Sequence, residues 1–398
     1  IQDAVYNSLL ISRRQQYHQL VAQVYEESFP ETVETQPELM THHYTEAGLN
    51  QQAANYWHQA GRIAMRRSAN IEAVSHFSKG LDLLESLPDS PERVSDELAL
   101  QISLGQCFAQ TRGYAAPEVQ RSFNRARELV DQVGESSQFS QVMFGLFVYY
   151  TLRAEFRSAR EVSELLLDNA ERIKDPTTLE VAHFMLGCVL FYEGELLEVQ
   201  KHFTQPMSRY EIDVHRSLAL SYFQEPTSSA MSFSSRNLWL QGYPDQAADH
   251  AQQALSLAQK ISHPFTLGFV TGFAAALQIW ARSFESALRY ADAVFNLGQE
   301  QSFTIWQVFG TMMQGVCWAK MGRYQEGISN INRGLTAFAA AGTLTARQQY
   351  LSFLADAHLD AGQAEDGLKA LAEAIASRVG QVDVIVDALA GDSITRGM

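Results

Sequence analysis

Cysteine is scarce in this chain, with three residues among 398. Cys107, Cys188 and Cys317 lie far apart, and no two of them form a C-x-x-C pair. The odd count and wide spacing argue against a disulfide framework or a cysteine-based zinc site, and they fit a reducing compartment, so we expect a cytoplasmic protein. Each cysteine follows a glycine by one or two residues inside a predicted helix, which predicts buried packing thiols rather than nucleophiles.

Positive charge is also in short supply. The chain has 30 Lys and Arg residues against 45 Asp and Glu residues, which gives a net charge of −15. Non-specific binding to nucleic acid depends on Lys and Arg that neutralise phosphates, so this balance argues against DNA or RNA as a partner. We interpret the one local basic strip, Arg62, Arg66 and Arg67, as the solvated face of a helix.

Long apolar runs and catalytic motifs are absent from the sequence as well. The most apolar stretches, 181–192 and 265–280, fall short of the roughly 20 residues that a membrane-spanning helix needs. The phosphate-binding motif G-x-x-x-x-G-K-S/T and the zinc motif H-E-x-x-H do not occur. His42 and His43 are adjacent, so on a helix they point in different directions and are predicted to be structural or surface histidines. We therefore expect no membrane span and no catalytic, cofactor-binding or metal-binding residues in this segment.

A repeat dominates what is present. Turn residues recur at a fixed distance, at Ala154, Gly194, Gly242, Arg282, Gly322 and Gly362. Every step is 40 residues except the step from Gly194 to Gly242, which is 48. Five residues after each turn comes a small or β-branched apolar residue, namely Ala159, Val199, Ala247, Ala287, Gly327 and Gly367. A period in this range is typical of a stacked helical-repeat array, and such arrays offer an extended binding surface.

Each repeat reads as two amphipathic helices around a tight turn. Apolar residues fall at the i, i+3, i+4 spacing of helices, and glycine suits the left-handed residue after a helix. Small residues such as Gly187, Gly315, Ala159 and Ala247 are expected to let helix backbones approach closely. Bulky aromatic residues on repeat positions are expected in the core, namely Trp57, Phe77, Phe123, Phe203 and Trp318.

The pattern of a mid-helix Leu or Gly, an aromatic residue and a Gly-x-Tyr turn resembles the tetratricopeptide repeat, as in Gly322-Arg-Tyr324. That repeat normally has 34 residues, so a 40-residue period implies longer helices, and HEAT or armadillo repeats have nearer lengths. We predict an all-α, right-handed superhelix of roughly eight tetratricopeptide-like hairpins.

A wider resemblance rests on the order of several segments. These are residues 2–18, 34–48 and 53–60, together with Gly113-Tyr-Ala-Ala-Pro-Glu-Val, Gly242-Tyr-Pro-Asp-Gln-Ala and Ile261-Ser-His-Pro-Phe. Over about residues 1–376 the chain resembles the C-terminal helical region of large bacterial signalling ATPases of the STAND type. In that family the region follows a P-loop ATPase module, often with an adenylate or guanylate cyclase, a kinase or a DNA-binding domain elsewhere. The missing phosphate loop means that the resemblance lends no nucleotide-binding residues to this segment.

The pattern also predicts how the chain is divided. Residues 1–30 are expected to form a linker helix from an upstream module, because the chain starts with Ile1 and reads as a piece of a longer protein. A polar connector from Phe29 to Pro37 and N-terminal tetratricopeptide-like helices over 34–88 follow, and the repeat array runs over 92–376. The eight extra residues fall near 205–228, where an insertion in a solenoid often marks the binding face. Residues 377–398 leave the pattern and are a cap, a natural ending or a non-native tail.

The function implied is that of a non-catalytic sensor and interaction arm. It is expected to bind a protein or peptide partner or a small effector, and to regulate an ATPase or other output domain in the same chain. Two alternatives stay open, a passive oligomerisation scaffold and a small-molecule sensor with a closed internal cavity. The candidate contact residues near the insertion are Tyr222, Arg236, Trp239 and Trp280.

Overall fold

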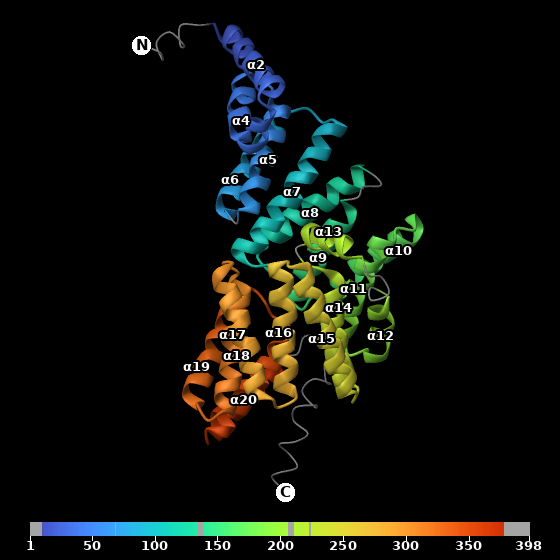
Figure 1. Cartoon of the computed structure of the whole chain (residues 1–398), viewed down its shortest axis with the longest axis vertical. Coiled ribbons are helices and arrows are strands. Elements are labelled where there is room, and N and C mark those ends of the chain that lie inside the picture. The colour runs from blue at the N-terminus through green and yellow to red at the C-terminus, as the bar shows by residue number, and fades with distance from the viewer. Residues whose placement is uncertain (1–9, 68, 134–137, 206–210, 223, 378–398) are drawn as a thin grey trace. The chain divides into compact units, whose positions relative to one another are not determined.

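The computed structural model describes residues 10–67, 69–133, 138–205, 211–222 and 224–377 (Figure 1). Every regular element within these residues is an α-helix, and there are twenty of them. The predicted fold class, an all-α solenoid of tetratricopeptide-like hairpins, is confirmed. None of the helices in the described residues is long and apolar enough to cross a membrane.

The helices fall into two compact units. Unit 1 takes in the residues up to Arg112 together with Pro117–Val142, and unit 2 takes in Gly113–Ala116 together with the residues from Met143 onward. The boundary between the units lies inside the predicted array. The domain limits expected from the sequence remain predictions, and of the expected cap at 377–398 only Ser377 belongs to the described residues.

Unit 1 begins with a long helix and ends with a long hairpin. Its helices are α2 (Ile11–Ser28), α3 (Pro30–Thr35), α4 (Pro37–Glu46), α5 (Asn50–Arg66), α6 (Asn70–Glu85), α7 (Pro91–Arg112) and α8 (Pro117–Val133). The expected connector from Phe29 to Pro37 contains the short helix α3, because proline at its first position is pre-set for a helical turn. Helix α5 packs against both α4 and α6, so it serves two hairpins. Arg62, Arg66 and Arg67 are exposed on α5 and just beyond its end, as predicted.

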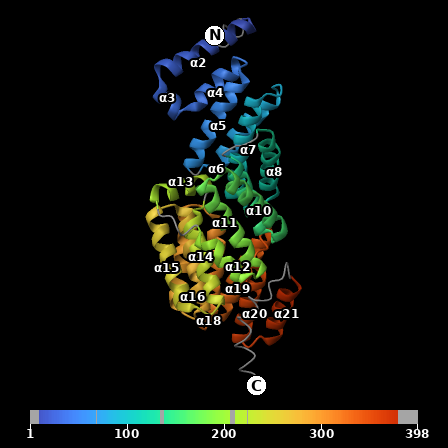
Figure 2. The same cartoon turned by 90° about the vertical axis from the view of Figure 1, so that its right-hand side faces the viewer.

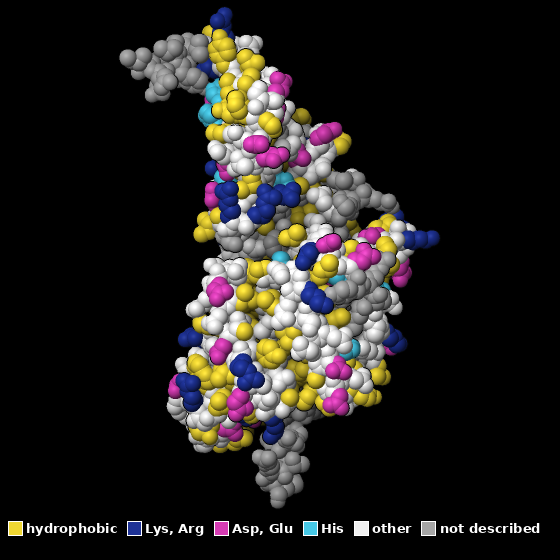
Figure 3. All heavy atoms as spheres, viewed as in Figure 1, with side chains coloured by type: hydrophobic (Ala, Val, Ile, Leu, Met, Phe, Trp, Pro, Cys, Tyr) yellow, Lys and Arg dark blue, Asp and Glu magenta, His cyan; other side chains and the backbone are white. Residues whose placement is uncertain are grey.

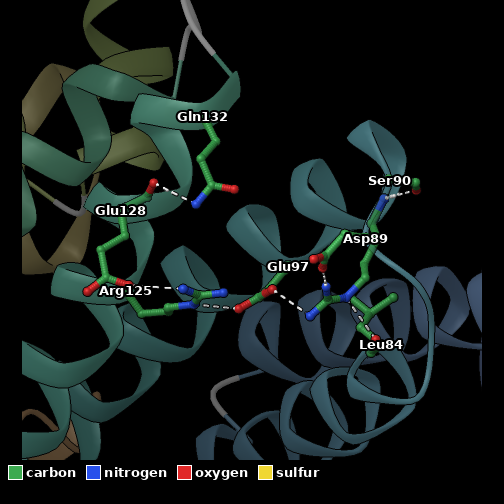
Figure 4. A network of polar contacts seen from close by, with 8 residues as sticks. Leu84, Asp89, Ser90, Glu97, Arg125, Glu128 and Gln132 are labelled. Atoms are coloured by element: carbon green, nitrogen blue, oxygen red, sulfur yellow. Dashed lines mark hydrogen bonds and ion pairs between the residues drawn. The ribbon is translucent and has the colours of Figure 1, made fainter.

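A buried carboxylate ties α7 to its neighbours in unit 1. Glu97 accepts a hydrogen bond from Nε of Arg125 on α8 at 2.7 Å and lies 3.5 Å from Nη2 of Arg93 (Figure 4). Arg93 also donates from Nε to the carbonyl oxygen of Leu84 near the end of α6 at 2.9 Å. Arg125 in turn pairs with Glu128 at 2.9 Å. The network therefore joins three successive helices through one acid.

Unit 2 is a run of hairpins. Its helices are α9 (Phe139–Leu152), most of which lies in this unit, α10 (Phe156–Ile173), α11 (Pro176–Glu193), α12 (Leu196–Thr204), α13 (Ile212–Tyr222), α14 (Pro226–Leu240), α15 (Pro244–Ile261), α16 (Pro264–Trp280), α17 (Phe284–Glu300), α18 (Thr304–Lys320), α19 (Tyr324–Ala340), α20 (Arg347–Asp360) and α21 (Ala364–Ala376). Figures 1 and 2 show neighbouring hairpins such as α16/α17 and α18/α19 side by side. With α5/α6 and α7/α8 of unit 1, the described residues contain eight hairpins. The eight extra residues accompany α13, a helix that has no counterpart in the other repeats.

The turns inside the hairpins adopt the backbone that the period implies. Positive φ angles occur at Gly113, Ala154, Gly194, Gly242, Arg282, Gly322 and Gly362. Ala154 and Arg282 adopt this left-handed conformation although they are not glycine, with φ of 58° and 57°. The hairpin geometry therefore outweighs the local preference of these two residues.

Glycines and large aromatic residues mesh where the helices of a hairpin meet. A Cβ built on Gly187 of α11 would lie 2.5 Å from the ring of Phe203 on α12, so only glycine fits under that ring. Gly61 with Phe77 and Gly105 with Phe123 repeat this relationship in unit 1. The three phenylalanines are buried, as predicted.

The prediction that Trp57 and Trp318 are core residues is wrong, because both are only half-buried. Lys79 Nζ lies 4.6 Å from the ring centroid of Trp57, and the guanidinium carbon of Arg323 lies 4.4 Å from that of Trp318. Each indole thus packs at the surface beneath a cation, and the attraction of the cation to the ring face accounts for this placement. The tryptophan buried in the core of unit 2 is instead Trp306.

Unit 2 also makes a contact between its first and last hairpins. The backbone amides of Leu344 and Thr345, in the link between α19 and α20, donate to the carbonyl oxygen of Leu152 at 2.7 and 3.1 Å. The Thr345 hydroxyl donates to the carbonyl oxygen of Thr151. The run of hairpins therefore bends back until its far end meets the end of α9, and the first helices of the hairpins face a common interior.

Candidate functional site: an aromatic pocket in unit 2

A cavity of about 140 Å³ lies in this interior. The first helix of each hairpin from α9 to α20 contributes to its wall, together with the α19–α20 link. The lining is mostly aromatic and aliphatic, and its aromatic members are Tyr114, Phe147, Phe184, Tyr192, Phe233, Phe265, Phe269, Phe273, Trp306, Phe309, Phe338, Tyr350 and Phe353. An apolar cavity with few polar groups is the usual form of a small-molecule or side-chain binding site.

The sequence of α16 shows why this wall is aromatic. Phe265, Phe269 and Phe273 are spaced four residues apart, so they lie on one face of the helix. The rings of Phe269 and Phe273 stack with centroids 4.2 Å apart, and Phe273 meets Phe233 of α14 edge-on at 4.9 Å. Gly268 and Gly272 lie next to this stripe, where a Cβ would meet Trp306 or Phe309 of α18. The glycines allow α18 to approach, and the phenylalanines line the space that remains.

One cation reaches this wall. Arg236 of α14 is 5% exposed, and its guanidinium donates from Nη2 to Oε1 of Gln349 on α20 at 3.1 Å. Its guanidinium carbon lies 5.2 Å from the ring centroid of Phe191 and 4.9 Å from those of Phe273 and Trp280. Nε of Arg236 is buried and makes no hydrogen bond to any residue that the structure describes. Burial lowers the pKa of the guanidinium, but arginine keeps its charge in proteins.

The structure brings two of the four sequence candidates together. The indole of Trp280 stacks against the Arg236 guanidinium. Trp280 and Trp239 both lie outside the lining of the pocket, and Trp239 packs with Leu238, Ala247 and Leu277. Tyr222 is buried on α13, where its ring meets Phe144 of α9 edge-on at 5.1 Å. The last two residues therefore support neighbouring helices.

Several residues of the site were not singled out from the sequence. Tyr192, Gln349 and Tyr350 lie at the pocket with Arg236, and burial raises the pKa of the Tyr350 hydroxyl to about 12, so this hydroxyl stays neutral near pH 7. Thr151 lines the pocket with a buried hydroxyl that has no hydrogen-bond partner among the described residues. The four-residue spacing of the phenylalanines in α16 is the sequence pattern from which the aromatic wall of the pocket could have been predicted. The hydrogen bond between Gln349 and Arg236 could not be predicted from the sequence, because the two residues are 113 positions apart.

The three cysteines are buried and free, as predicted. Burial raises the pKa of the Cys107 and Cys317 thiols to about 12. Cys188 lines the pocket, and burial raises its pKa as well. Because the thiolate is the reactive form, none of these thiols has the properties of a nucleophile.

A second group of polar side chains lies beside α13. Glu180 of α11, His215 of α13 and Glu225, the N-cap of α14, are buried and offer ligand atoms within 4.8 Å of one another. His215 Nδ1 lies 2.9 Å from Glu225 Oε1, and the Glu225 carboxylate accepts from the backbone amides of Thr227 and Ser228 at 2.8 and 2.7 Å. These contacts cap α14 and hold α13 against it. We interpret the group as structural, since its carboxylates are already engaged.

Comparison with known proteins identifies a fold. No family model and no curated protein matches the sequence. A solved structure of a Rap protein complexed with competence and sporulation factor is 13% identical over 86% of this chain and 89% of that one, with a TM-score of 0.53. The Rap conjugation gene regulator of the plasmid pLS20, with the Phr* peptide, is 12% identical over 84% of this chain and 76% of that one, with a TM-score of 0.47. A signal transduction ATPase with a tetratricopeptide repeat sensor, from Pyrococcus horikoshii, is 12% identical over 81% of this chain and 47% of that one, with a TM-score of 0.40. At 13% identity the first likeness speaks for the fold alone, and that fold is a helical-repeat protein.

Proposed function

We propose that this chain is a non-catalytic sensor domain whose unit 2 pocket binds an effector, and that it belongs to a larger bacterial signalling protein of the STAND type. The observation that carries the proposal is the buried Arg236, which faces an apolar cavity inside a ring of hairpins. Of the occupants left open by the sequence, a cavity of about 140 Å³ favours a small effector or one inserted side chain. The Rap protein of similar fold was solved with a bound factor, which is compatible with this role.

The mechanism follows from the contact that closes unit 2. Residues that line the pocket on α9, α14 and α20 come from hairpins far apart in the chain. A ligand that touches all of them stabilises the closed arrangement over any arrangement in which the contact at Leu152 is broken. A ligand shifts such an equilibrium only by its difference in affinity for the two arrangements. The shift toward the closed arrangement would then change the conformation of the neighbouring hairpins and, through them, the attached output domain.

The test is regulation in the complete protein that carries this chain. Its nucleotide hydrolysis or other output is measured with and without a low-molecular-mass extract of the source cells, for the unchanged protein, for Arg236→Met and for Arg289→Gln. Arg289 is exposed on α17 and serves as the control. We expect the response to be lost in Arg236→Met alone. A complete reading frame without a phosphate loop would contradict the STAND assignment, and an unchanged response in Arg236→Met would contradict the role of the pocket.

An oligomerisation scaffold is the second candidate, and one observation in unit 1 favours it. Tyr17, Leu20 and Val24 lie on α2 at helical spacing and are 51%, 57% and 44% exposed, and Figure 3 shows hydrophobic side chains gathered at this helix. An exposed apolar stripe of this kind is typical of an interaction surface. Molar mass by light scattering over a range of concentrations tests it. A mass that rises with concentration, and that falls to the monomer value in Leu20→Ser/Val24→Ser, would favour the scaffold.

A further inference from the structure

The chemistry of the pocket indicates which class of effector it takes, and this step rests on the proposed function. Arg236 carries a full positive charge at 5% exposure. A buried arginine normally forms an ion pair with a nearby carboxylate. Within the described part of the chain, however, no Asp or Glu side chain pairs with Arg236. Its polar partners, Gln349 and Tyr192, are both neutral. A buried charge without a countercharge is strongly unfavourable.

The aromatic rings around Arg236 offset only part of this cost. Phe273 and Trp280 each lie with their centroids 4.9 Å from the guanidinium carbon, a distance at which cation–π attraction operates. Within the described part of the chain, the Nε–H group of Arg236 has no hydrogen-bond partner. A planar guanidinium with a free donor fits the two oxygens of a carboxylate, which can accept parallel hydrogen bonds and supply the missing negative charge.

The rest of the pocket limits the size and the polarity of the group to which the ligand's carboxylate is attached. Its other walls are mostly aromatic and aliphatic, and the hydroxyl of Thr151 makes no hydrogen bond to any described residue. The indole nitrogen of Trp306 is not among the groups offered to a ligand, because it lies against α16 at Gly268. The volume of about 140 Å³ is close to that of an engineered apolar cavity of roughly 150 Å³ that holds benzene. There is room for one ring or a short branched chain.

We propose that the unit 2 pocket binds a small apolar monocarboxylate, the size of one aromatic ring or a branched aliphatic chain, with its carboxylate on Arg236. A phosphate ester or nucleotide is disfavoured, since it would bring two or more negative charges and a larger polar body to a single cation. A free acid and the C-terminal carboxylate of an apolar peptide share the required chemistry. The cavity volume favours the free acid.

The experiment compares acids with their neutral amides on the purified 398-residue chain. Phenylacetate and 3-methylbutanoate are titrated against phenylacetamide and 3-methylbutanamide by calorimetry, and thermal shifts are recorded in parallel, because a ligand of the native state raises its stability. We expect at least one acid to bind ten-fold or more tightly than its amide. The tripeptide Ala-Ala-Phe, with a free or an amidated C-terminus, separates a peptide source from a free acid.

Variants locate the carboxylate. Arg236→Met is expected to lose the preference for the acid and to bind the amide at least as well, whereas the exposed control Arg289→Gln keeps the preference. If Arg236→Met does not fold, Arg236→Gln, which removes the charge but keeps hydrogen-bonding groups, should also lose the preference for the acid. Equal binding of acid and amide to the unchanged chain, or no binding of any probe, would overturn the inference. Regulation of the complete protein through Arg236 would still stand in that case, so the two proposals fail separately.

Discussion

The backbone amide of Thr345 donates a hydrogen bond to the carbonyl oxygen of Leu152 across 3.1 Å. The Thr345 hydroxyl donates to the neighbouring carbonyl of Thr151, which lies 194 residues away in the chain. This pair of bonds joins the first and last hairpins around the pocket. It is the part of unit 2 on which the closed arrangement most directly depends.

We predict that Thr345→Val destabilises unit 2 by about 1–3 kcal/mol, because it removes the donor of a buried carbonyl while keeping the shape of the side chain. Urea unfolding measures the loss, and hydrogen exchange of the Leu344 and Thr345 amides locates it. Thr343→Val is the matched control, since the Thr343 hydroxyl makes no hydrogen bond within the described residues. Equal exchange rates in the unchanged chain and in Thr345→Val would contradict the role of this contact.

The glycine beneath Phe203 gives a second prediction. In Gly187→Ala the new methyl carbon would lie 2.5 Å from the ring, so the two helices must separate, at a cost of about 1–3 kcal/mol. Phe203→Leu alone leaves a gap and is also destabilising. Combined, the two changes should cost less than the sum, with a coupling of about 1 kcal/mol, because the smaller side chain makes room for the methyl group. Denaturation of the two single variants and the double variant gives this coupling directly, and strict additivity would show that the ring does not set the helix spacing.

The same residues show what the sequence could predict. The 40-residue period located six hairpin turns whose turn residue is left-handed, including Ala154 and Arg282, because the period reports a geometry that these repeats share. It could not distinguish Trp318, at the surface beneath Arg323, from Trp306 in the core. That difference depends on which side of a helix the neighbouring hairpin covers.

The pocket was the part that sequence could least predict. Arg236 and Trp280 were candidates from their place after the insertion, and the structure stacks them. Gln349 joins them only because small rotations between successive hairpins accumulate until α20 returns to α14. No local sequence pattern specifies the total rotation over several hairpins. Long-range contacts such as the one between Thr345 and Leu152 could therefore be found only in the structure.

Buried histidines predict how stability depends on pH. Burial lowers the pKa of His58 and of His183 to about 4, aided by the nearby charges of Arg62 and His202 respectively. In the unfolded chain both titrate near pH 6.5, so between about pH 6.5 and pH 4 the unfolded state binds more protons. The stability that the neutral rings provide is therefore complete above pH 6.5 and is lost as the pH falls toward 4. Each contributes on the order of 1 kcal/mol after allowance for partial exposure.

Urea midpoints at pH 7.5, 6 and 5 test this dependence. His58→Gln keeps a polar partner for Ser103, whose hydroxyl oxygen lies 2.9 Å from His58 Nε2, and it removes the titration. We expect a shallower fall with pH in this variant and in His183→Asn than in the unchanged chain. A slope that is the same in all three proteins would show that carboxylates alone govern the acid sensitivity.

The acid that joins three helices of unit 1 supplies the last prediction. Glu97 is 8% exposed and lies between Arg93 and Arg125 (Figure 4). Glu97→Gln keeps the shape of the side chain but removes the charge that both guanidinium groups share, and we expect a loss of about 2 kcal/mol. Glu128→Gln removes an exposed partner of the same Arg125 and should cost less than about 0.5 kcal/mol. Hydrogen exchange across α7 and α8 in the complete chain measures both variants, because faster exchange confined to these helices places the loss in unit 1. If Glu128→Gln weakened α7 and α8 as much as Glu97→Gln does, the contacts between these helices would not depend mainly on the buried Glu97.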